Sequence, residues 1–275
     1  MVKRRKHFDI SIIILIVVVL FSSCVSKVPK DDSSFFQALG EDGAFVMTST
    51  KENLVNLGVN LDIEPKLLNK IDRVSVSLKD DEFYGGLEGK FSSFFVNTAL
   101  VVAKDYKKEG DYFNKIDSSL QIGSPKNNLL IISSNKFDQA RQKTVDNRVI
   151  NIDSFTAELM KNADLAVYSN KPTSLKLLGY DIDDSIALTM KTLLVYFKDG
   201  MVYLSADFKD EKSANSFSTV IRASYITGLK KRKEKIDINV LKQIFTLENN
   251  LVEIKGIAMM DSQIQNIDLI IENFI

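Results

Sequence analysis

Apolar and polar residues alternate in several short stretches of the chain. Val74, Val76 and Leu78 alternate with polar neighbours, which is the period of a strand with one buried face. Two later apolar runs are separated by Asp199-Gly200, a pair that favours the tight turn of a β-hairpin. Another two runs meet at Asn249-Asn250, and Asn tolerates the left-handed backbone of such turns. These stretches predict antiparallel strands.

Other stretches carry apolar or small residues three or four positions apart, the spacing of one helix face. A strand expected over 44–48 is followed by a short helix that ends at Gly58. A longer helix is expected where Ala214, Phe217, Ile221, Ser224 and Gly228 share a face, and a last helix where Ile264, Ile267, Ile271 and Phe274 do. Strands and helices therefore alternate along the chain.

The two halves of the chain resemble each other at an offset of about 121 residues. Leu54-Val55-Asn56-Leu57-Gly58 aligns with Leu175-Lys176-Leu177-Leu178-Gly179, and Asn127-Asn128-Leu129 aligns with Asn249-Asn250-Leu251. This alignment indicates a tandem duplication. The predicted fold class is α+β, with two tandem similar units, each a mixed or antiparallel sheet with helices packed on one face. We expect the first unit over 35–145, a connector over 146–161 and the second unit over 162–275.

The N-terminal segment has the pattern of an export signal. A basic start, Lys3-Arg4-Arg5-Lys6, precedes an unbroken apolar run from Ile12 to Phe21, and Ser22-Ser23-Cys24 follows. The run is shorter than the roughly 20 apolar residues that a membrane-spanning helix needs. It therefore predicts a signal peptide over 1–23, with small residues at the cleavage site.

In this segment the chain resembles the bacterial lipoproteins, in the relaxed form of spirochaete members, because Phe21 stands where Leu is usual. The resemblance implies that Cys24 receives a diacylglycerol group and becomes the new N-terminus, followed by a tether over 24–34. The chain would then lie in the cell envelope, attached to a lipid bilayer. Val25 in place of Asp favours the outer membrane, facing the periplasm or the surface. An uncleaved anchor and an ordinary secretory signal are the alternatives, and both also export the body.

Composition excludes several kinds of chemistry from the mature chain. The single histidine, His7, lies in the signal peptide, there is no Trp, and Cys24 is the single cysteine. Without His the chain has no Ser-His-Asp or Cys-His machinery and no His-ligated zinc. Cleavage removes four of 36 basic and one of 36 acidic side chains, which leaves 32 and 35. This near balance argues against a nucleic-acid partner.

Clusters of acidic residues and of glycines are candidate binding sites. The three aspartates within 181–184 lack the glycine and distal Glu of a calcium loop, so one of them is expected to cap a helix. Asp80, Asp81 and Glu82 are expected in a solvated hairpin turn. Gly85, Gly86 and Gly89 lack the helix and Lys-Ser/Thr pair of a phosphate loop. Glycines inside a strand indicate that another segment approaches closely. Because none of these clusters has the pattern of a binding site, we predict no metal and no cofactor.

The densest charge run is basic, and it consists of Lys230, Lys231, Arg232, Lys233 and Lys235. It follows a predicted helix, and cations there complement the C-terminal carbonyl groups. The run could also form a membrane-facing patch, because each basic side chain near an anionic bilayer contributes about 1 kcal/mol. Three nearby aromatic residues of the first half, Phe91, Phe94 and Phe95, are expected in the core. The alternative is an apolar groove between the two units that could bind an acyl chain or a peptide.

Three functions are compatible with these observations. The leading hypothesis is a non-enzymatic envelope lipoprotein that acts as a binding or scaffolding module for an envelope protein or lipid. The alternative is a carrier of lipid or another small hydrophobic ligand. The third is a hydrolase that uses two carboxylates, which would have to face each other at roughly 5–10 Å.

Overall fold

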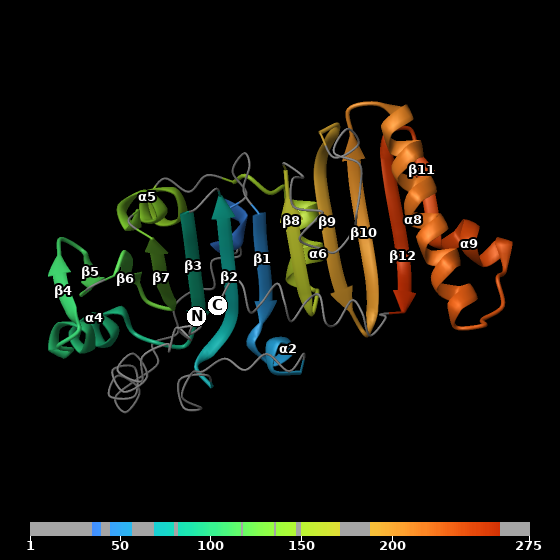
Figure 1. Ribbon diagram of the computed structural model, residues 1–275. Coiled ribbons are helices and arrows are strands. Elements are labelled where there is room, and N and C mark those ends of the chain that lie inside the picture. Colours follow the sequence, from blue (N-terminus) through green and yellow to red (C-terminus); the bar gives the residue numbers. More distant parts are fainter. Residues whose placement is uncertain are drawn as a thin grey trace, which may run out of the picture. The chain divides into compact units, whose positions relative to one another are not determined.

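The computed structural model describes residues 35–39, 45–56, 69–79, 82–116, 118–134, 136–146, 150–170 and 188–258 (Figure 1). Two units are distinguished: a first unit of Met1–Leu39 and Thr48–Asn151, and a second unit of Gly40–Met47 and Ile152–Ile275. Several sequence predictions lie outside the described residues: the signal peptide, Cys24, the tether, Gly58, Asp80, Asp81, the aspartates within 181–184 and the C-terminal helix.

The first unit is built on antiparallel strands. Its elements are the 3-10 helix η2 (Phe35–Ala38), β1 (Phe45–Thr50), α2 (Lys51–Asn56), β2 (Ile71–Lys79), β3 (Glu82–Gly89), α4 (Ser93–Val102), β4 (Tyr106–Glu109), β5 (Tyr112–Lys115), β6 (Leu120–Lys126), β7 (Leu129–Ser134), α5 (Phe137–Arg141) and the π-helical turn η3 (Gln142–Asp146). The strand order is β1-β2-β3-β7-β6-β5-β4. Residues Phe45–Met47 of β1 group with the second unit.

The second unit is also an antiparallel sheet with helices. Its elements are α6 (Ser154–Lys161), β8 (Leu165–Ser169), β9 (Met190–Lys198), β10 (Met201–Phe208), α8 (Glu211–Lys231), α9 (Ile238–Ile244), β11 (Phe245–Glu248) and β12 (Leu251–Ala258). Its own strands follow the order β8-β9-β10-β12-β11. Helix α8 packs against β10, β11 and β12, and α6 packs against β8 and β9 (Figure 1).

Two hairpin predictions are confirmed. Asp199 and Gly200 join β9 to β10 with φ of 52° and 73°, the left-handed pair that a two-residue hairpin turn requires. Asn249 has φ 53° between β11 and β12. Val74, Val76 and Leu78 lie in β2, which pairs antiparallel with β3, but the prediction of a single buried face is wrong, because Ser75 and Ser77 are also buried.

The face predicted for the long helix is partly wrong. Ala214, Phe217 and Ile221 are buried in α8, and the Phe217 ring contacts Phe208 of β10 at a centroid distance of 5.2 Å. Ser224, however, is exposed. The packed stripe continues four positions after Ile221, at the half-buried Tyr225, whose ring contacts Phe245 at a centroid distance of 5.5 Å. A 3.6-residue period needs such a four-residue step, and the sequence did not show where it falls.

The glycines of β3 allow another segment to approach closely, as predicted. A Cβ on Gly86 would lie 2.1 Å from the Phe35 ring, and a Cβ on Gly89 would lie 2.1 Å from the Lys70 carbonyl oxygen. All four side chains of η2 are buried. The segment that follows the predicted tether is therefore part of the core of the first unit.

The described structure is mainly antiparallel sheet with helices packed against it. The sequence predicted α+β units, and the structure bears out the sheet with its helices at this coarser level. Within the described residues, no helix combines the length and the apolar character needed to cross a bilayer.

Candidate binding surfaces

Helix α4 presents apolar side chains to solvent. Its sequence contains no charged residue, and Phe94, Val101 and Val102 are 69%, 60% and 75% exposed. Ile116, in the turn that follows β5, is 50% exposed and bonds through its N–H to the carbonyl of Asp105. We call these four residues the α4 surface. The prediction that Phe94 lies in the core is wrong, whereas Phe91 is buried as expected.

The opposite face of α4 packs on the sheet. Leu100 joins a cluster of buried side chains that also contains Phe91, Tyr106, Phe113, Ile122 and Leu130. Only Ala99 and Leu100 are fully buried in the helix itself. Because a helix normally turns its large apolar side chains to the core, the exposure of the α4 surface is unusual for a helix packed on a sheet.

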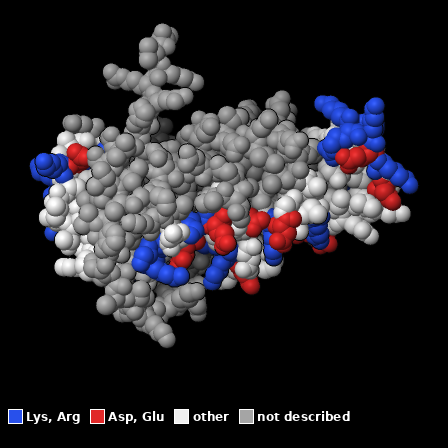
Figure 2. Space-filling model, turned by 90° about the horizontal axis from the view of Figure 1, so that it is seen from below, with Lys and Arg blue, Asp and Glu red and all other residues white. Residues whose placement is uncertain are grey.

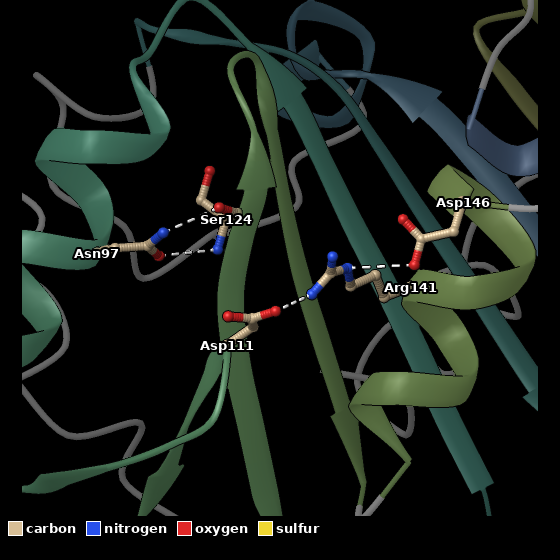
Figure 3. A network of polar contacts seen from close by, with 5 residues as sticks. All are labelled: Asn97, Asp111, Ser124, Arg141 and Asp146. Atoms are coloured by element: carbon tan, nitrogen blue, oxygen red, sulfur yellow. Dashed lines mark hydrogen bonds and ion pairs between the residues drawn. The ribbon is translucent and has the colours of Figure 1, made fainter.

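Two polar contacts fix α4 in this orientation. The Asn97 amide donates to the Ser124 carbonyl at 2.9 Å and accepts from the Ser124 N–H at 3.0 Å (Figure 3). Asn127 accepts hydrogen bonds from the N–H and the hydroxyl of Ser93, the first residue of the helix. Since Asn97 satisfies both backbone groups of Ser124, it attaches α4 to β6 beside the side of the helix that carries Phe94 and Val101.

A second polar group ties the β4–β5 hairpin to α5. Arg141 forms ion pairs with Asp111 and with Asp146, the latter at 3.3 Å between Nε and Oδ2 (Figure 3). The hydrogen bond to Asp111 raises the pKa of Arg141, against the effect of its partial burial. Because the Arg141 guanidinium pairs with both carboxylates, these three residues form a structural bridge. They lack the arrangement of a catalytic acid/base pair.

Other acidic side chains of the described residues are also paired or dispersed. Glu82 contacts Lys136, and this hydrogen bond lowers the Glu82 pKa. Among the residues that the structure describes, no group of three or more His, Cys, Asp or Glu side chains could hold a metal ion.

The basic run lies at the end of α8 (Figure 2). Lys230, Lys231, Arg232, Lys233 and Lys235 are all exposed. Arg232 is the C-terminal cap residue and contacts Glu234, and the contact with Glu234 raises the Arg232 pKa. Ile238 and Val240 of α9, just beyond the run, are 68% and 48% exposed. The run thus combines a helix cap with an exposed cationic and apolar surface.

The sequence did not point to the α4 surface as a site. The signal was present, because residues 91–103 contain no charge and Phe94, Val101 and Val102 have the seven- and eight-residue spacing of one helix face. Such a pattern normally marks a core face, and the sequence contains no information on which side of α4 meets the sheet.

The chain is similar in fold to proteins of known structure. No family model and no curated protein matches the chain. Crystal form III of TP0453 matches with a TM-score of 0.54 and 11% identity, over 89% of this chain and 100% of that chain. Crystal form I of TP0453 matches with a TM-score of 0.55 and 11% identity, over 89% of this chain and 99% of that chain. The chain therefore has the fold of TP0453, and at this identity the likeness extends to the fold alone.

Proposed function

We propose that the chain is a lipid-anchored, non-enzymatic binding protein of the cell envelope, attached to a bilayer through acylated Cys24. The N-terminal pattern supports the anchor, and the absence of His from the mature chain supports a non-enzymatic role. The observation that carries the proposal is the α4 surface, whose exposed apolar side chains offer an envelope protein or lipid a place to bind.

Exposing the apolar side chains of the α4 surface to water costs free energy. Single exposed apolar residues are ordinary, but a cluster on one helix marks an interaction site. Covering apolar area contributes about 25 cal/mol per Å², so a partner that covers Phe94 and Val102 gains binding energy. Their replacement costs the fold little, because both side chains are largely exposed.

The test is site-specific crosslinking in native membranes. A photoreactive residue replaces Thr98, which is exposed on α4, or Gln139, which is exposed on α5 and serves as the matched control. We expect a reproducible adduct with a protein or lipid from Thr98, and its loss when Phe94→Ser and Val102→Ser are added. Equal adducts at both positions, or no effect of the two serines, would contradict a binding role for α4.

The basic run is a second proposed surface, which faces anionic headgroups. Its support is the exposed pair Ile238 and Val240 beside four exposed lysines. Each lysine would contribute about 1 kcal/mol at an anionic surface. Replacement of Lys230, Lys231, Lys233 and Lys235 by Gln should weaken binding of the body to vesicles that contain phosphatidylglycerol and leave neutral vesicles unaffected. Unchanged binding to the phosphatidylglycerol vesicles would contradict a membrane-facing role, and the basic run would then act only as the cap of α8.

We also propose that the body is a tandem duplication of one α+β unit. Strand β9 starts 119 residues after β2, and β10 starts 119 residues after β3. The order β1-β2-β3-β7-β6 corresponds to β8-β9-β10-β12-β11, with α4 and α8 each following the third strand. The β4–β5 hairpin is then an insertion in the first copy. An experimental structure in which the two units do not superpose in this order would contradict the duplication.

A further inference from the structure

The segment next to the tether is fixed along β2 and β3. The Phe35 N–H donates to Glu88 near the end of β3, and Leu39 accepts at its carbonyl from the Ser77 hydroxyl at 3.2 Å. Ser77 pairs with Tyr84, close to the β2–β3 turn. Residues 35–39 therefore run from the level of Glu88 towards that turn, and Phe35 is nearer the end of the sheet where β3 stops.

Helix α4 begins at the same end of the first unit. Gly89, the last residue of β3, donates through its N–H to the Asn128 carbonyl, and the Asn128 N–H donates to the Phe91 carbonyl. Ser93, the first residue of α4, donates through its N–H to the side-chain oxygen of Asn127. Helix α5 lies at the other end, because Ser134, three residues before it, bonds through its hydroxyl to the N–H of Phe83 beside the β2–β3 turn.

The length of chain before Phe35 limits how far this end can be from the lipid. Eleven residue steps separate Cys24 from Phe35, and a fully extended chain covers at most about 3.6 Å per residue, or about 40 Å in all. Because η2 is buried, residues beyond Phe35 add nothing to this reach unless the core opens.

We infer that the bilayer that holds the Cys24 lipid is what covers the α4 surface, so that the α4 end of the first unit faces the membrane and the α5 end faces away. The inference rests on the proposed anchoring. Phe94, Val101 and Val102 would lie at the boundary of headgroups and acyl chains, where apolar helix faces settle. Exposed Lys104, Lys107 and Lys108 follow the helix, and such side chains can reach phosphate groups while their stems stay on apolar surface.

The test uses the full lipidated protein in vesicles of phosphatidylcholine and phosphatidylglycerol. Since Cys24 is the single cysteine and its thiol is acylated, Thr98→Cys and Gln139→Cys each introduce one free thiol for a fluorophore. Lipids brominated high in the acyl chain then quench a fluorophore close to the bilayer. We expect quenching at Thr98 to exceed that at Gln139 several-fold, and Phe94→Ser with Val102→Ser to reduce the difference.

The outcomes separate the orientation from the anchor. Acylated, vesicle-bound protein with equal quenching at the two positions would overturn the orientation and leave the anchor intact. Strong crosslinking of Thr98 to a protein in native membranes, without quenching in vesicles, would assign the α4 surface to a protein partner and also overturn the inference. Protein that carries no acyl chains and does not float with vesicles would overturn the orientation together with the proposed function.

Discussion

Phe35 and Gly86 form the contact that joins the start of the fold to its sheet. The Phe35 ring fills the space that a side chain at position 86 would take. Arg73 lies over the neighbouring Phe36 ring at 5.6 Å and donates to the Thr48 hydroxyl at 3.0 Å. Burial lowers the pKa of Arg73, against the effect of Glu88. Gly86 thus lets η2 lie close enough to the sheet for Phe36 to contact Arg73.

Replacing Gly86 by Ala should destabilise the first unit. The new Cβ would require movement of Phe35, and overpacking of this kind costs about 1–3 kcal/mol. Gly85→Ala is the matched control, because the nearest atom to its Cβ would be the far end of the Phe83 ring, at 3.0 Å. Urea denaturation measures both variants. Equal losses of unfolding free energy would show that the Phe35 contact is not what requires glycine.

Local backbone preferences could be predicted from sequence because they depend on one or two residues. Asp199-Gly200 and Asn249 specified turns by their tolerance of positive φ, and the structure has both. The contact of Phe35 with Gly86 could not be predicted, since it joins positions 51 residues apart. The glycines indicated that some segment comes close, without identifying the segment.

Helix α8 shows how a charged cap defines the start of an element. The Asp210 side chain accepts from the Ser213 N–H at 2.8 Å and from the Ser213 hydroxyl at 3.0 Å. These hydrogen bonds hold the Asp210 pKa below its usual value. A lowered pKa in the folded state means that the carboxylate stabilises the fold above its ordinary pKa and loses this effect as the pH falls through the lowered value.

The pH dependence of Asp210→Asn tests this cap. Asn caps helices about as well as Asp but does not titrate, so the wild type should lose stability relative to the variant as the pH falls below about 4. Asp210→Ala should be less stable than both at neutral pH. The measurement is urea denaturation at several pH values between 7 and 3. A constant difference between wild type and Asp210→Asn would show that the carboxylate charge contributes nothing.

The faces of the helices were harder to predict than their existence. In α8 the half-buried Tyr225 packs on Phe245 where the sequence indicated Ser224. In α4 the sequence places apolar residues on several faces, and the structure buries Ala99 and Leu100 while Asn97 bonds to Ser124 of β6. Burial depends on such tertiary contacts, which periodicity alone does not contain. The α4 surface therefore emerged only from the structure.

In the whole molecule, the third strand of each unit is followed in the sheet order by a strand pair, β7-β6 in the first unit and β12-β11 in the second, and the first unit adds β5-β4 at its edge. The offset of about 121 residues in the sequence predicts this correspondence. The finer prediction, two copies of one ancestral unit, remains a proposal, as does the lipid anchor that lies outside the described residues.

The measurement that tests the anchor most directly is the intact mass of the protein extracted from its native membrane, compared with that of Cys24→Ala. Anchoring predicts the mass of residues 24–275 plus acyl chains, and loss of the acylated species in the variant. A full-length mass without acyl chains would contradict it. In that case residues 1–23 would be a retained segment, His7 would be part of the mature protein, and the inferred orientation of the first unit would lose its premise.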